Sequence, residues 1–103
     1  MKSLTRMEEI ILIAIFHLDD EAYGVNIREK VKKMTGKNFS VGAIYVPLER
    51  LAKRKLLETE IGEPTPERGG RRKRYYKLSK NGLASLREIK RLQNAIWAGI
   101  ELT

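Results

Sequence analysis

The sequence predicts a mainly α-helical fold with one small β-hairpin, and three observations support this prediction. Apolar residues recur at steps of three and four over most of the chain, which is the spacing of amphipathic helices. Between residues 56 and 78 the pattern changes to that of two strands separated by a segment rich in glycine and proline. A last helical pattern then runs to the end of the chain. We therefore expect one domain over residues 1–78 and an appended helix over residues 79–103.

The first helix is predicted to begin at Thr5, because Thr5 and Glu8 form a capping-box pattern. The following apolar residues cover so much of the helix that we expect it to be largely buried, in the domain core or in a subunit interface. These residues are Met7, Ile10, Ile11, Leu12, Ile13, Ala14, Ile15, Phe16 and Leu18. The acidic residues 19–21 are expected to end the helix.

A second helix is predicted over about residues 22–35, with Gly36 as its C-terminal cap. Its apolar face consists of Tyr23, Ile27, Val31 and Met34.

A third helix is predicted to begin after Ser40, which can cap it, and to reach Arg54. Its apolar residues at helical spacing are Val41, Ile44, Tyr45, Leu48, Leu51 and Ala52. Pro47 lies inside this pattern, and since proline lacks a backbone donor we expect a kink there.

A β-hairpin is predicted from a strand at residues 56–61, a loop at 62–70 and a return strand at 72–78. The alternation in the return strand places Tyr76 and Leu78 on its inward side.

The last helix is predicted to run for about 24 residues, or roughly 36 Å, which is too long for the small domain to cover. Its apolar stripe therefore needs a partner, and we expect a second copy of the chain. The predicted dimerisation residues are Leu83, Leu86, Ile89, Leu92, Ile96, Trp97 and Ile100. Trp97 has a second possible use, as one wall of an apolar ligand pocket, but packing in the dimer seam is the favoured interpretation.

Three helices followed by a basic hairpin are typical of the winged helix-turn-helix arrangement. In that arrangement the third helix enters the major groove of DNA and the hairpin, or wing, lies along the backbone or in the minor groove.

Charge supports the same interpretation. The chain holds 21 Lys and Arg against 13 Asp and Glu, a formal net charge of +8, which favours binding to a polyanion.

The chain has no cysteine, and its longest apolar run, Ile10–Phe16, is shorter than the roughly 18 residues of a membrane span. We therefore expect a cytoplasmic protein without a membrane partner.

The strongest local signal is the segment 68–77, which holds six cations and no acid. A solvated basic turn would give the same composition. Its position on a hairpin behind a helix-turn-helix pattern favours DNA contact instead. The predicted DNA-binding cations are Arg68, Arg71, Arg72, Lys73 and Arg74.

The third helix supplies the other predicted DNA contacts, namely Ser40, Gly42, Ala43, Tyr45, Val46, Arg50 and Lys53. Its small residues permit close approach to base edges, while Arg50 and Lys53 suit phosphates. Tyr45 could equally bind a phosphate or pack in the core. Glu49 could accept from a cytosine amine, but an ion pair with Lys53 four residues later is favoured.

An enzyme is not predicted. His17 is the only histidine, and the sequence has no metal-ligand spacing, nucleophile motif or phosphate-binding glycine loop. No cofactor is expected.

Four stretches resemble the PadR family of transcriptional regulators. They are residues 9–12, residues 22–27 with Tyr23-Gly24, residues 40–45 followed by Leu48 and Arg50-Leu51, and residues 70–79 with Gly82. The resemblance implies a homodimer held largely by the terminal helix, which usually represses nearby genes until a small molecule or other signal relieves it. The single terminal helix is similar to that of the short subgroup. The chain departs from the family pattern at Ala43, commonly Thr, and at Val46, which separates Tyr45 from Pro47.

The sequence thus predicts a homodimeric transcriptional regulator that binds double-stranded DNA at a pseudo-palindromic operator. We expect it to act as a repressor. Two other functions remain open: a winged-helix module that binds proteins instead of DNA, and a sensor whose small-molecule effector lies beside Trp97 at the dimer seam.

Overall fold

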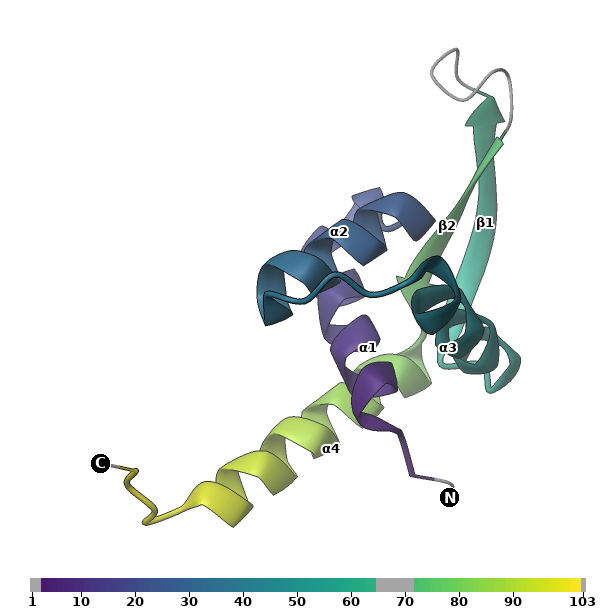
Figure 1. Ribbon diagram of the computed structural model, residues 1–103. Helices are drawn as coiled ribbons and strands as arrows, with labels where there is room; N and C mark the ends of the chain where they lie inside the picture. Colours follow the sequence, from purple (N-terminus) through teal and green to yellow (C-terminus); the bar gives the residue numbers. More distant parts are fainter. Residues whose placement is uncertain (1–2, 65–71, 103) are drawn as a thin grey trace.

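The computed structural model describes residues 3–64 and 72–102. Over these residues it confirms the mainly helical fold with one hairpin (Figure 1). The elements are α1 (Arg6–Leu18), the short 3-10 helix η1 (Asp19–Glu21), α2 (Gly24–Thr35), α3 (Val41–Lys53), β1 (Leu57–Pro64), β2 (Arg72–Leu78) and α4 (Lys80–Trp97). Helices α1, α2 and α3 pack together, the hairpin extends away beside α3, and α4 leads away from this body in another direction.

The helix ends lie where the capping residues predict. Thr5 Oγ1 accepts from Glu8 N while Glu8 Oε1 accepts from Thr5 N, which completes the capping box of α1. Ser40 Oγ accepts from Ala43 N at the start of α3, and Ser79 Oγ accepts from Gly82 N at the start of α4. Gly36, with a φ of 73°, ends α2 in the left-handed conformation.

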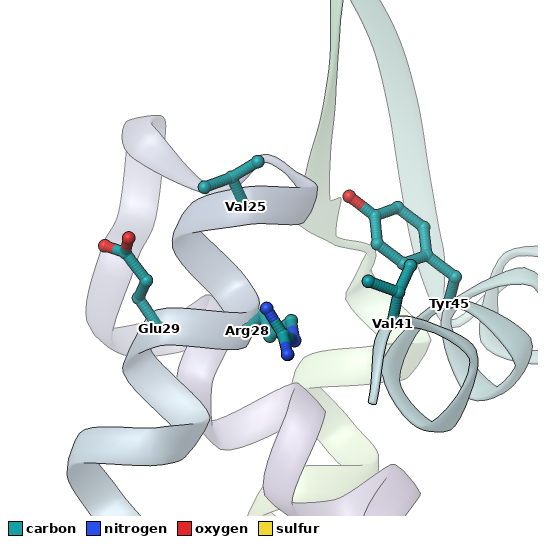
Figure 2. A pocket seen from close by; sticks show the side chains of 5 residues that line it. All are labelled: Val25, Arg28, Glu29, Val41 and Tyr45. Atoms are coloured by element: carbon teal, nitrogen blue, oxygen red, sulfur yellow. The ribbon is translucent and has the colours of Figure 1, made fainter. Parts of the chain in front are cut away.

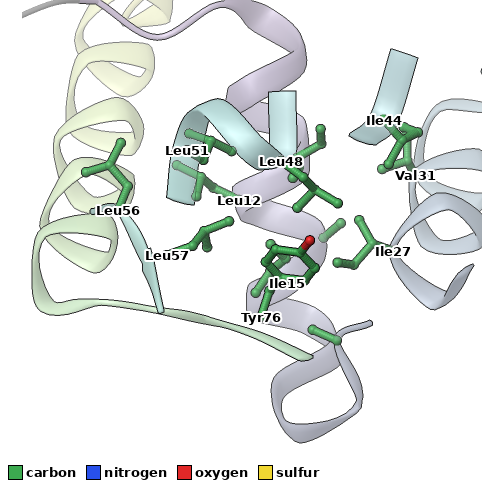
Figure 3. Packing of buried hydrophobic residues seen from close by; sticks show 13 residues of the cluster. Leu12, Ile15, Ile27, Val31, Ile44, Leu48, Leu51, Leu56, Leu57 and Tyr76 are labelled. Atoms are coloured by element: carbon green, nitrogen blue, oxygen red, sulfur yellow. The ribbon is translucent and has the colours of Figure 1, made fainter. Parts of the chain in front are cut away.

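The core lies where α1 meets α2, α3 and the base of the hairpin (Figure 3). Its fully buried large side chains come from the three helices and are Ile11, Leu12, Ile15, Ile27, Val31, Ile44, Leu48 and Leu51. One prediction about this core was wrong. Met34 is 37% exposed because it lies in the last turn of α2, beyond the buried Ile27 and Val31. Phe16 on α1 is exposed in the single chain, so of the two expected places for it, core and subunit interface, it does not occupy the core.

Helix α3 continues through Pro47, which is buried in the core, and ends at Lys53. The helix therefore has the length that the apolar pattern predicts, to within one residue.

The hairpin is antiparallel, with Leu57 opposite Leu78 and Ile61 opposite Arg74. Its first strand reaches Pro64, past a register shift after Ile61, so the predicted loop at 62–70 starts too early. On the return strand Tyr76 is buried and Leu78 half-buried, which confirms their inward placement. Tyr76 N also donates to Ala22 O at 2.8 Å, which ties the hairpin to the turn before α2.

Helix α4 spans 18 residues, fewer than the predicted 24. The helix stops at Trp97 because Ala98 adopts an extended conformation and Gly99 a φ of 77°. Ile100 therefore lies beyond the helix, and its predicted place on the helical stripe was wrong. Only the first part of α4 packs on the domain, through the buried Gly82 and the half-buried Leu86. None of the helices in the described ranges is long and apolar enough to cross a membrane.

Candidate nucleic-acid interface

The outward face of α3 is defined by the residues opposite its buried side. Ile44, Leu48 and Leu51 are fully buried, and at 100° per residue the positions facing away from them are Gly42, Val46, Glu49 and Lys53. All four are exposed, and Ser40 and Val41 at the helix start are exposed as well. Ala43 is half-buried on the flank of this face. Three of the seven predicted α3 contacts, Gly42, Val46 and Lys53, thus share a surface that is open to a ligand.

Tyr45 lies between α2 and α3 and is half-buried (Figure 2). A Cβ atom added at Gly24 would lie 1.9 Å from Tyr45 Oη, so only glycine leaves room for the ring. Tyr45 also lines a shallow cavity of about 220 Å³ together with Val25, Arg28, Glu29 and Val41. The sequence left two possible uses for Tyr45, packing in the core and binding a phosphate. In the structure its side chain packs at the edge of the core and reaches the surface between α2 and α3.

Arg28 fixes the turn that precedes α3. Its Nε donates to Phe39 O at 2.8 Å, and its Nη2 donates to Asn38 Oδ1 at 3.4 Å. The turn residues and Ser40 are thereby held against α2. Sequence reasoning missed this role, because nothing in the local pattern distinguishes Arg28 from the other surface cations of α2.

Glu8 is a carboxylate only 3% exposed, and it joins the start of α1 to the last turns of α3. Its Oε2 lies 3.4 Å from Arg50 Nε, and its Oε1 lies 3.8 Å from Arg54 Nη1. Burial acts to raise the pKa of Glu8, but the hydrogen bonds from the Thr5 backbone and from Arg50 outweigh it, so the pKa lies below its ordinary value. Arg50, predicted to bind phosphate, is therefore directed back toward α1 by this pair.

Glu49 pairs with Arg74 of the hairpin rather than with Lys53, so that prediction was wrong. Arg74 Nη1 lies 2.9 Å from Glu49 Oε1, and Tyr76 Oη donates to the same oxygen at 3.3 Å. The Arg74 guanidinium also lies over the Tyr76 ring, 5.4 Å from its centroid. Burial is the main cause of the raised pKa of Tyr76, and the Glu49 carboxylate adds to it against the opposing charge of Arg74. This contact anchors the hairpin on α3.

The other hairpin cations lie on two sides of β2. Arg72 is exposed, whereas Lys73 Nζ lies 4.2 Å above the ring of Tyr23, which in turn makes an edge contact with Tyr75. Arg68 and Arg71, also predicted to bind DNA, lie outside the described residues. The described surface therefore combines an exposed helix face with cations from Lys53 and from the hairpin beside it.

The predicted dimerisation residues divide into two groups along α4. Leu83, Leu86 and Ile89 are half-buried near the domain. Leu92, Ile96 and Trp97 are about half exposed, as is Ile100 beyond the helix. A second cavity of about 380 Å³ lies between α1, β2 and α4, lined by Ile15, Phe16, Asp19, Lys77, Leu78 and Leu83. Trp97 borders neither this cavity nor the one beside Tyr45.

Comparison with known proteins agrees with this geometry. Residues 11–88 match the model of the transcriptional regulator PadR-like family. A PadR-like transcriptional regulator from Bacillus cereus superposes with a TM-score of 0.72 at 29% identity, covering 87% of this chain and 82% of that one. The winged-helix DNA-binding protein F93 from STIV superposes with a TM-score of 0.74, covering 97% of this chain and 100% of F93. Because the two sequences are only 18% identical, this likeness shows the fold alone.

A curated relative, uncharacterized protein X of Lysinibacillus sphaericus, is 31% identical over 85 residues, which are 81% of this chain and 73% of the relative. The family match covers the helix-turn-helix, the hairpin and the first half of α4, and the family consists of transcriptional regulators rather than enzymes. The fold is therefore a winged helix, and the chain belongs to the PadR-like family of transcriptional regulators.

Proposed function

We propose that this protein is a sequence-specific repressor that acts in the cytoplasm as a homodimer on a pseudo-palindromic DNA operator. The observation that carries the proposal is the outward face of α3. Its residues are exposed, while the helix itself is held by the core, by Glu8 and by the Glu49 contact to the hairpin. A helix fixed in this way, with a basic hairpin beside it, has the geometry of a recognition helix and its wing.

The homodimer is supported by the apolar residues of α4 that the domain leaves exposed. Leu92, Ile96 and Trp97 are 49%, 56% and 50% exposed, and a second copy would bury them. Trp97 is assigned to this seam because its side chain is half exposed beside Ile96 at the end of α4. Two copies would present their α3 helices to half-sites about 34 Å, or one DNA turn, apart.

Selection of bound duplexes from a random pool tests sequence specificity. We expect enrichment of a pseudo-palindrome whose half-sites are one helical turn apart, bound about 10³-fold or more tighter than random duplex at the same salt concentration. Equal affinity for the selected and the random duplexes would show that the protein is not a sequence-specific regulator.

Charge variants test whether the described surface makes the contacts. Lys53→Ala and Arg72→Ala should each weaken binding to all duplexes and reduce the slope of log K against log salt by about 0.9. Arg87→Ala removes the same charge from the exposed surface of α4 and should leave the slope unchanged. Loss of a protein partner with an unchanged slope would instead favour a protein-interaction module.

A reporter assay tests the sign of regulation. With the selected operator placed at a promoter, we expect the protein to lower reporter expression, and the Lys53→Ala variant to restore it. Higher expression with the intact protein would identify an activator and contradict the repressor assignment.

A further inference from the structure

The centre of the outward face of α3 carries no polar side chain. Val46 lies there, 55% exposed, with Gly42 one turn before it. A Cβ atom added at Gly42 would meet nothing within 4 Å, so the fold does not require a glycine at this position. The missing side chain instead allows the helix to approach another surface more closely, and Val46 is then the first side chain to reach it.

The polar residues around this centre are already engaged in the structure. Glu49 Oε1 accepts from Arg74 and Tyr76, Arg50 is paired with Glu8, and Ser40 Oγ caps the helix. Lys53 lies two turns beyond Val46, at the last position of the helix. The group that the centre of this face presents to the base edges is therefore the apolar side chain of Val46.

An apolar side chain can still distinguish bases in the major groove. Of the groups that the four base pairs present there, the 5-methyl of thymine is the one that an apolar side chain contacts favourably. Lys53 lies on the same outward face of α3 as Val46, and the Arg74–Glu49 contact joins the basic strand β2 to this helix. These cations can hold the phosphates while Val46 faces the bases. Val41, also exposed at the start of α3, extends the apolar surface toward α2.

We propose that Val46 is a specificity-determining residue of α3 and that it recognises the 5-methyl group of a thymine in each operator half-site. This inference rests on the proposed function, since it requires that α3 enter the major groove. It adds the chemical group that the helix reads and the residue that reads it.

The test replaces thymine by deoxyuridine, one position at a time, in the duplex selected by the intact protein. Deoxyuridine keeps the base pair and removes only the methyl group. We expect one symmetric pair of positions at which each replacement weakens binding about fourfold, the effect of losing one buried methyl-sized contact. In Val46→Ala the same replacements should have a smaller effect, because the two γ-methyl groups of valine are gone and the remaining Cβ reaches less far.

Val25→Ala is the matched control, since Val25 is 50% exposed but lies on α2. This variant should keep the preference for thymine over deoxyuridine. A selected sequence that tolerates deoxyuridine at every position would overturn the inference and leave the proposed function intact. An undiminished thymine preference in Val46→Ala would show that another residue reads the methyl group. The absence of any selected sequence would overturn both proposals.

Discussion

At the residue scale, Glu8 has two structural functions. Its carboxylate completes the capping box of α1 and also accepts from Arg50 at the far end of α3, 42 positions away in the chain. Because the carboxylate is buried, both functions depend on its negative charge being balanced by these donors. The position of the recognition helix is thus linked to the ionisation of one side chain.

The lowered pKa of Glu8 predicts a pH-dependent contribution to stability. A depressed carboxyl pKa stabilises the fold above the ordinary value of 4.5, and this contribution is lost as the pH falls through the lowered value. Glu8→Gln keeps a capping side chain but loses the charge, so we expect its free energy of unfolding at pH 7 to fall by about 1.5–3 kcal/mol. Urea denaturation of both proteins between pH 7 and pH 3 should show the difference narrowing below pH 4.5.

Glu88→Gln is the control for this experiment. Glu88 also pairs with an arginine, Arg91, and its pKa is also lowered, but the pair is fully exposed on α4. Solvent screens such a pair, so we expect no measurable change in stability. Equal effects of the two substitutions would contradict the structural role of Glu8.

Substitution by alanine should have opposite effects on stability at two glycines near the starts of helices, Gly82 and Gly42. At Gly82 an added Cβ would lie 2.1 Å from the carbonyl oxygen of Leu56, so Gly82→Ala should destabilise the protein by about 3 kcal/mol. At Gly42 the space is open, so Gly42→Ala should stabilise α3 by about 0.5–1 kcal/mol and yet weaken DNA binding. Denaturation and DNA titration of both variants measure the two effects, and unimpaired binding by Gly42→Ala would refute the close approach.

At the element scale, the contact of Glu49 with Arg74 and Tyr76 determines how the hairpin is set against α3. The hairpin is also attached at its base, through the hydrogen bond from Tyr76 N to Ala22 O. A half-exposed ion pair on the proposed DNA-binding side therefore joins α3 and β2, whose contacting residues are 25 positions apart in the chain.

Removing the charge of Glu49 should change DNA binding more than stability. Both partners are about half exposed, so Glu49→Gln should change the free energy of unfolding by about 1 kcal/mol or less. Arg74 would then be free to bind a phosphate, and we expect tighter binding to random duplex with a salt slope steeper by about 0.9. Measuring the affinity for random duplex across a salt series checks this prediction. Glu58→Gln on β1 is the control, because it removes the same charge without freeing Arg74.

At the scale of the whole molecule, the length of 52 Å along the longest axis reflects the hairpin and α4, which extend from the helical body in opposite directions (Figure 1). The exposed apolar residues of its second half are the proposed seam of the homodimer. Ile96→Glu would place an unpaired charge in that seam, and we expect dimerisation to weaken more than about a hundredfold, or ~3 kcal/mol.

Sedimentation of Ile96→Glu should therefore show monomers where the unmodified protein shows dimers. Ala84→Glu places the same charge on the opposite, exposed side of α4 and should remain dimeric. If both variants dimerised like the unmodified protein, the seam would lie elsewhere.

Much of the fold could be predicted from the sequence because it follows from local patterns. Caps such as Thr5 and Gly36, and the period of the apolar residues, act over a few positions and can be identified there. The apolar period fails as a guide where the backbone ends the helix: it continues to Ile100, although Gly99 adopts a left-handed conformation that an α-helix does not contain.

The partners of charged residues could not be predicted, because they depend on contacts between distant segments. Residue type and helical spacing suggested Lys53 for Glu49 and phosphate for Arg50, whereas the fold brings Arg74 and Glu8 to them. Val46 and Lys53 are exposed, as their predicted DNA contacts require, and those contacts stay predictions.

The outward face of α3 also has a consequence for how such regulators diverge. Positions 42, 46 and 53 are exposed, and the core holds α3 through its other side, so substitutions at these three positions leave the scaffold intact. If α3 reads the operator as proposed, single substitutions there would give new operators without a compensating change elsewhere. After a gene duplication, two copies of this chain could separate their targets while keeping one fold.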